Sequence, residues 1–126
     1  WWGCEPEAPV SKKDFRWISM IRQPGFVTQE TLAYAQEQVA MKKPHLDTEA
    51  GRLDSFREGL CVQCLHTGPY DDEPATLARM RSFMEQETLL PDMEGLRTHH
   101  EIYLSDPRKT PPERLKTILR IPVRRR

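Results

Sequence analysis

The chain has 126 residues, enough for one domain with a modest core, and its 19 basic and 19 acidic residues cancel to a net charge of zero. This balance argues against a surface that binds nucleic acid or membrane by charge, and no apolar run is long enough to span a bilayer. Three cysteines are an odd number and do not suggest a disulfide framework, so we expect a reducing, cytoplasmic compartment.

The first third of the chain predicts a strand followed by a helix. Residues 15–23 alternate in the manner of a strand, which puts Trp17 and Met20 on opposite faces, and a Pro-Gly pair ends it. Thr28 is placed to cap a helix that extends to about Lys42. The apolar stripe of this helix consists of Leu32, Ala35 and Val39. The polar stretch that follows predicts a loop or linker.

The middle of the chain predicts a strand and a second helix. Residues 59–68, GLCVQCLHTG, form a mostly apolar run bounded by glycines, which is typical of a strand. A helix is expected from about Glu73 to Glu87, with Asp71 or Asp72 as its cap. Its buried side is expected to comprise Leu77, Met80, Phe83 and Met84.

After a predicted loop at residues 90–98, the chain shows the pattern strand, short helix, strand. Glu101 and Tyr103 point to one face of the first of these strands, whose other face is apolar. Thr110 and two prolines predict the start of the short helix, which carries Leu115. One face of the final strand consists of Leu119, Ile121 and Val123.

This order of elements fits neither a helical bundle nor the regular alternation of a parallel sheet. We therefore expect an α+β fold, with an antiparallel or mixed sheet and the helices on one face. The other face would form a cleft, because an acid and aromatic side chains point to it.

Five side chains are candidates for such a cleft. Glu101 could hold a cationic ligand, or act as a general base on water if burial raises its pKa; the alternative is a solvated acid. Tyr103 and Tyr70 could line the cleft or bind a ligand, or could be half-buried with their hydroxyls in water. Trp2 and Trp17 could stack on a polycyclic ligand or belong to the core.

Two further patterns suggest metal or redox chemistry without requiring it. Cys61 and Cys64 lie three residues apart, so on a strand they point to opposite faces, and we interpret both as small core residues. The spacing of the neighbouring histidines does not demand a metal site with Glu101, and structural roles are favoured for His66, His99 and His100. We therefore expect no metal and no cofactor.

Three stretches together resemble the GyrI-like family of small-molecule-binding domains. They are WISMIRQPGFVT, LHTGPYDDEPAT and HHEIYLSDPRKTPPERLKTILR, and they cover much of the chain from Trp17 onward. The family is related to the effector-binding domains of multidrug-sensing regulators. The resemblance implies a strand-helix-strand-strand unit used twice, with a ligand cleft between the two copies.

The resemblance also implies how the chain divides. A single GyrI-like domain would span residues 1–126, with residues 1–24 as the end of the first unit, 25–58 as helix and linker, and 59–126 as a complete second unit. The first strand and helix of the first unit are then absent, so this unit is incomplete. The unpaired sheet edge that results would favour a homodimer.

The branch of the family that this sequence resembles most hydrolyses cyclopropane-bearing, DNA-alkylating natural products, which protects the cell. We therefore expect a flat, apolar ligand, cationic or electrophilic. Glu101 would position or activate water, and Tyr103 or Tyr70 would orient the ligand or stabilise charge. The implied ligand-binding residues are Trp2, Tyr70, Trp17, Met20 and Tyr103. A non-catalytic drug sensor or sequestering module remains an alternative, as does a protein-interaction domain. Direct DNA binding is not expected, because the sequence has no helix-turn-helix segment.

Overall fold

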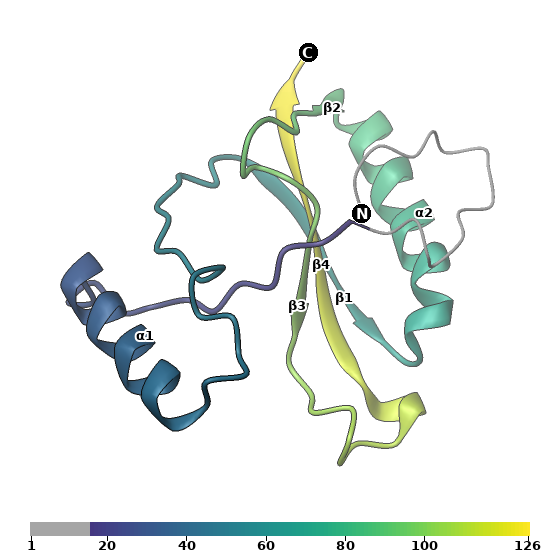
Figure 1. Ribbon diagram of the computed structural model, residues 1–126. Helices are drawn as coiled ribbons and strands as arrows, with labels where there is room; N and C mark the ends of the chain where they lie inside the picture. The colour runs from purple at the N-terminus through teal and green to yellow at the C-terminus, as the bar shows by residue number, and fades with distance from the viewer. Residues whose placement is uncertain (1–15) are drawn as a thin grey trace. The chain divides into compact units, whose positions relative to one another are not determined.

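Figure 1 shows the computed structural model, which describes residues 16–126. The contacts within the chain divide it into two compact units. One comprises residues 18–55, and the other contains residues 56–126. No helix in the described part of the chain is long and apolar enough to cross a membrane.

The smaller unit is built on helix α1 (Gln29–Lys42). Thr28 caps it as predicted, in a capping box with the threonine three positions further on. Nε2 of Gln36 donates to the carbonyl oxygens of Thr48 and Gly51 over 2.6 and 2.9 Å, which ties the following loop to the helix. No residue of α1 is fully buried, so the predicted apolar stripe forms no closed core.

The strand predicted at residues 15–23 is wrong over its described part. Residues 16–23 form neither strand nor helix, and the side chains of Trp17 and Met20 are 74% and 50% exposed. An alternating sequence makes a strand only where a neighbouring strand satisfies its backbone groups. Within residues 16–126 the sheet pairs no strand with this segment.

The larger unit is a four-stranded antiparallel sheet with one helix packed on it (Figure 1). Strand β4 pairs with β1 along one edge, and with β3 and then β2 along the other. This architecture confirms the predicted α+β class. In chain order the elements are β1 (Cys61–Thr67), the 3-10 turn η2 (Tyr70–Asp72), α2 (Glu73–Gln86), β2 (Leu89–Pro91), β3 (His100–Tyr103), the 3-10 turn η3 (Pro112–Arg114) and β4 (Lys116–Arg125).

The core of this unit lies between α2 and one face of the sheet. It consists of Val62, Met80, Met84, Leu119, Ile121 and Val123. Leu77 packs against it as predicted, whereas Phe83 is 48% exposed. The prediction that Phe83 is buried was wrong. Successive residues lie about 100° apart around a helix, so Phe83 is turned away from the side on which Met84 is buried.

The starts of α2 and η3 differ from prediction in their caps. Asp72 occupies the N-cap position of α2, but its side chain makes no capping hydrogen bond. The turn η2 precedes the helix, and there the backbone N–H of Glu73 donates to the carbonyl of Tyr70 instead. Pro111, not Thr110, precedes η3. A backbone turn thus stands where a cap from Asp72 was one of the two expected, and Pro111 stands where a cap from Thr110 was expected.

Candidate functional site

The register of β3 decides which face of the sheet carries the predicted acid. Glu101 pairs with Leu119 and Tyr103 pairs with Thr117, and directly opposed residues in an antiparallel sheet share a face. Leu119 belongs to the core under α2, so Glu101 and Tyr103 stand on the helix-bearing face. The expectation that they occupy the face away from the helices is therefore wrong. Alternation along β3 predicts that they share a face, but not which face the helix covers.

Glu101 is held by its neighbours two positions away on either side. The Tyr103 hydroxyl donates to Oε2 over 2.5 Å, and Nε2 of His99 lies 3.5 Å from Oε1. The hydrogen bond with His99, followed by that from Tyr103, lowers the pKa of Glu101 although burial acts in the opposite direction. The condition set for a general base, a pKa raised by burial, is therefore not met, and Glu101 is an ionised carboxylate at neutral pH.

Two tyrosines adjoin this carboxylate. Burial, and then the hydrogen bond to Glu101, raise the pKa of Tyr103, so its hydroxyl keeps its proton and remains a donor. The ring of Tyr70, in turn η2, meets the ring of Tyr103 edge-on, with centroids 5.5 Å apart and planes at 72°. The structure therefore brings together three of the predicted site residues: Glu101, Tyr103 and Tyr70.

Glu73, in the first turn of α2, is a fourth member that the sequence analysis missed. Its side chain is buried, and Oε1 has no hydrogen-bond partner within residues 16–126. Burial, and secondly the charge of Glu101, raise the pKa of Glu73 to about 7. Nothing local distinguishes Glu73 from the two aspartates before it, because all three suit the start of a helix. We call Glu101, Tyr103, Tyr70 and Glu73 the Glu101 cluster.

His66 fixes the segment that carries Tyr70 and Glu73. Its Nε2 donates to the carbonyl of Pro69 over 2.9 Å, and its Nδ1 lies 3.0 Å from the Thr76 hydroxyl. The carbonyl oxygen can only accept, so Nε2 carries a proton, and Nδ1 shares the second hydrogen bond with the Thr76 hydroxyl. The ring thus ties β1 to η2 and α2, which confirms a structural role for His66.

The other predicted site residues are not part of this arrangement. Trp2 lies outside the described residues, and the exposed Trp17 and Met20 stand in a segment without secondary structure, so their binding roles stay predictions. Cys64 packs against the core, whereas Cys61, on the opposite face of β1, bonds weakly to the Glu58 carbonyl. Within residues 16–126 no group of three His, Cys, Asp or Glu side chains could hold a metal ion.

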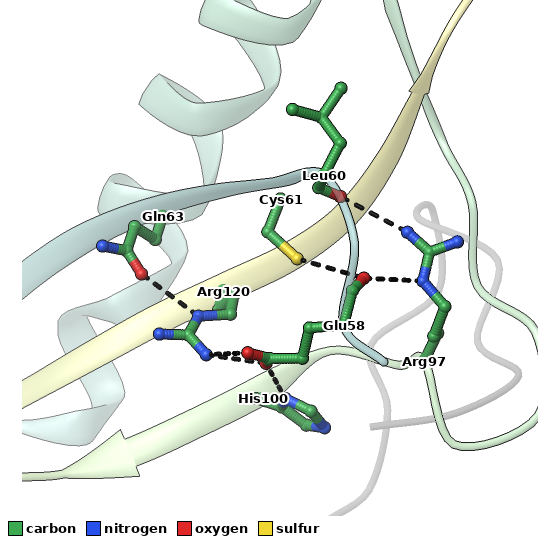
Figure 2. A network of polar contacts seen from close by, with 7 residues as sticks. All are labelled: Glu58, Leu60, Cys61, Gln63, Arg97, His100 and Arg120. Atoms are coloured by element: carbon green, nitrogen blue, oxygen red, sulfur yellow. Dashed lines mark hydrogen bonds and ion pairs between the residues drawn. The ribbon is translucent and has the colours of Figure 1, made fainter. Parts of the chain in front are cut away.

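The opposite face of the sheet carries a charged network that the sequence analysis also missed (Figure 2). Arg120 donates to both carboxylate oxygens of Glu58, over 2.6 and 2.5 Å, and through Nε to Gln63 over 3.1 Å. Nδ1 of His100 lies 3.1 Å from the same carboxylate, and Nε of Arg97 donates to the Glu58 carbonyl over 2.7 Å. The Arg120 bond holds the pKa of Glu58 below its ordinary value. These contacts fasten the segment before β1 to the sheet.

The chain matches one family model and several solved structures. The family of GyrI-like small molecule binding domains matches residues 24–124. The crystal structure of a hydrolase from Listeria innocua is 52% identical, with a TM-score of 0.75, and the match covers 82% of this chain and 52% of that one. No curated protein matches the chain.

Two further crystal structures of proteins from Listeria innocua resemble this chain about as strongly. One, of an uncharacterized conserved protein, is 54% identical with a TM-score of 0.77, and the match covers 82% of this chain and 50% of that one. The other, of a hydrolase, is 52% identical with a TM-score of 0.73 and the same coverage, 82% and 50%. The chain therefore spans about half the length of the solved structures that it matches.

Proposed function

The chain belongs to the family of GyrI-like small molecule binding domains, and we propose that it binds a flat, largely apolar molecule at the Glu101 cluster and hydrolyses a strained ring in it. The observation that carries this proposal is the ionised Glu101, fixed by the Tyr103 hydroxyl beside the ring of Tyr70. The hydrolases from Listeria innocua, which are 52% identical to this chain over the matched part, add support. A strained cyclopropane is the proposed reacting group, and its hydrolysis would be a detoxification step.

The proposed reaction uses Glu101 to position water. Its carboxylate accepts a hydrogen bond from a water molecule and orients the oxygen toward a ring carbon. Water becomes far more acidic as it bonds to carbon, so a carboxylate of low pKa can take its proton late in the step. Tyr103 keeps the carboxylate in one orientation, and the tyrosine rings provide an apolar surface for a flat ligand.

A binding module without chemistry is the second candidate function. The same observation, a carboxylate whose pKa is lowered, gives a permanent negative charge beside aromatic rings. Such a site suits a cationic aromatic ligand, which a drug sensor or sequestering protein would hold without changing it. The two functions differ in whether the ligand leaves the site altered.

Titration with a panel of flat aromatic compounds, including a cyclopropane-bearing alkylator, distinguishes them. Binding is followed by intrinsic protein fluorescence and the product by mass spectrometry. Saturable quenching together with a mass gain of one water supports the hydrolase. Saturable quenching of unaltered compounds supports the binding module, and no quenching by any compound contradicts both.

Replacing Tyr103 with Phe tests the geometry of the carboxylate. The change removes the hydrogen bond that helps to lower the pKa of Glu101, so this pKa should rise and turnover should fall by about 10- to 100-fold. The measurement is kcat/KM as a function of pH, whose acid limb should move to higher pH. Tyr34→Phe, at a position 64% exposed on α1, is the matched control. An unchanged acid limb in Tyr103→Phe would contradict the assignment.

A further inference from the structure

The segment between Arg97 and His100 is held at both ends by one residue, Glu58. Nε of Arg97 donates to the Glu58 carbonyl over 2.7 Å, and Nδ1 of His100 lies 3.1 Å from the Glu58 carboxylate (Figure 2). His99 lies between these two contacts and belongs to no strand, because β3 begins at His100. The main chain and the side chain of Glu58 therefore hold the chain on either side of His99.

The Glu58 carboxylate is itself fixed by the central strand of the sheet. Arg120 of β4 donates to both of its oxygens, over 2.6 and 2.5 Å, and Arg120 is also the strand partner of His100. Hydrogen bonds between ionised groups are short and strong, and salt screens them less where they are partly buried. The side chains of Arg120 and His100 are both mostly buried. Glu58 thus has a defined position from which it holds the segment.

The backbone beside Glu58 is shaped for the contact with Arg97. Gly59 has a φ of +67°, in the left-handed region that favours glycine. A Cβ at this position would lie 3.3 Å from Nη2 of Arg97, which is tighter than most side-chain contacts. With glycine here, the guanidinium donates to the carbonyls of Glu58 and Leu60, over 2.7 and 3.4 Å. The close approach of Arg97 to the segment before β1 therefore depends on Gly59.

His99 connects this network to the opposite face of the sheet. The consecutive residues His99 and His100 meet acids on opposite faces, because His100 contacts Glu58 whereas Nε2 of His99 lies 3.5 Å from Oε1 of Glu101. The hydrogen bond with His99 is the largest cause of the lowered pKa of Glu101. The pairing of β3 with β4 starts at His100 and does not include His99. The position of His99 therefore depends on the contacts that hold its neighbours.

We propose that Glu58 is a positioning residue for the Glu101 cluster: by holding the chain at Arg97 and at His100, it keeps His99 against the Glu101 carboxylate. This assignment rests on the proposed function and extends it to a residue on the other face of the sheet. Glu58 acts through His99 and not on the ligand. Residues that support a reacting group in this way keep it within about 0.5 Å of its productive position.

The sign of one pKa change separates positioning from simple electrostatics. Glu58→Gln removes a negative charge, and this change by itself would lower the pKa of Glu101. Release of His99 acts in the opposite direction, because its hydrogen bond lowers that pKa. The other titratable groups that adjoin Glu101 are Tyr103 on its own strand and Glu73 on α2, and the substitution alters neither. A rise in the pKa of Glu101 is therefore specific for positioning.

A carbon-13 titration of the Glu101 carboxyl in the full chain measures this pKa without turnover. In Glu58→Gln the pKa should rise. With a cyclopropane-bearing alkylator as substrate, the acid limb of kcat/KM should move to higher pH, and kcat should fall by about 10-fold while KM changes little. Asp54→Asn also breaks a pair between a carboxylate and an arginine, the exposed contact of 2.5 Å with Arg52. This matched control should behave like the native chain.

Two further variants test the path through His99. His99→Leu should raise the pKa of Glu101 by itself, and Glu58→Gln should then add nothing to it, because the two changes remove the same interaction. Gly59→Ala alters no charge but displaces Arg97, so it should raise the pKa of Glu101 as well.

An unchanged or lower pKa of Glu101 in Glu58→Gln would overturn the proposal. The same holds if Glu58→Gln has an equal effect with and without His99. If Glu58→Gln does not fold, Gly59→Ala decides in its place, and an unchanged pKa of Glu101 in that variant would overturn the proposal. Absence of any product from the native chain would instead overturn the proposed hydrolysis, whereas the titration would still test the positioning.

Discussion

Glu101→Gln is expected to bind the ligand almost as well as the native chain and to lose most of its turnover, by roughly 100- to 10,000-fold. Glutamine keeps the size of the side chain and an oxygen that can accept from the Tyr103 hydroxyl, so the tyrosine rings should stay in place. It removes the negative charge that orients water and receives its proton. Affinity from fluorescence titration and product formation from mass spectrometry, on the same samples, measure the two effects separately.

Glu113→Gln provides the matched control for this change. Glu113 lies in η3, and its side chain is exposed, so the substitution removes one negative charge without altering the Glu101 cluster. The control should keep native binding and turnover. Native turnover in Glu101→Gln would contradict the proposed mechanism. If the native chain binds without turnover, weaker binding of cationic ligands by Glu101→Gln would favour the sensor function.

Glu73→Gln is expected to remove a pH-dependent change of about 3 kcal/mol from the free energy of unfolding. This value corresponds to a Glu73 pKa of about 7 in the folded chain, in place of 4.5. Below about pH 4.5 the acid is protonated in both states and contributes no pH dependence. Between the two pKa values the unfolded chain releases the proton while the folded chain retains it. The free energy of unfolding therefore falls as pH rises from 4.5 to about 7, and is constant above that range.

Urea denaturation of both proteins at about pH 5 and about pH 8 measures this effect. Groups that do not interact with Glu73 titrate identically in the two proteins, so the difference between them reports on Glu73 and its coupling to Glu101. The variant should gain stability relative to the native chain at the higher pH. Equal pH dependence would show that Glu73 titrates normally. A variant that is more stable and less active would indicate that Glu73 contributes to activity and lowers the stability of the folded chain.

Local patterns predicted the two α-helices and strands β1, β3 and β4, but they missed β2, which overlaps the start of a predicted loop. Thr28 caps α1 as expected, and the alternation of Leu119, Ile121 and Val123 identified the buried face of β4. The same rule predicted that Glu101 and Tyr103 share a face. These features depend on neighbours within a few residues, and such neighbours are visible in a sequence.

The sequence did not reveal features that depend on distant neighbours. Glu73 is 28 positions from Glu101, and Glu58 is 62 positions from Arg120, so no local pattern links either pair. The register of β3 against β4 decided which face carries Glu101, and a strand of four residues does not encode that choice. The division of the chain into repeated units stays a prediction.

The central place of β4 has a consequence for how this sheet forms during protein synthesis. Among the described residues, β1, β2 and β3 each pair with β4 and with no other strand, yet all three precede it in the chain. As the chain leaves the ribosome, these strands have no partner until β4 follows. The earlier segments therefore remain without strand partners until then, and such unpaired strands are open to aggregation and to binding by chaperones.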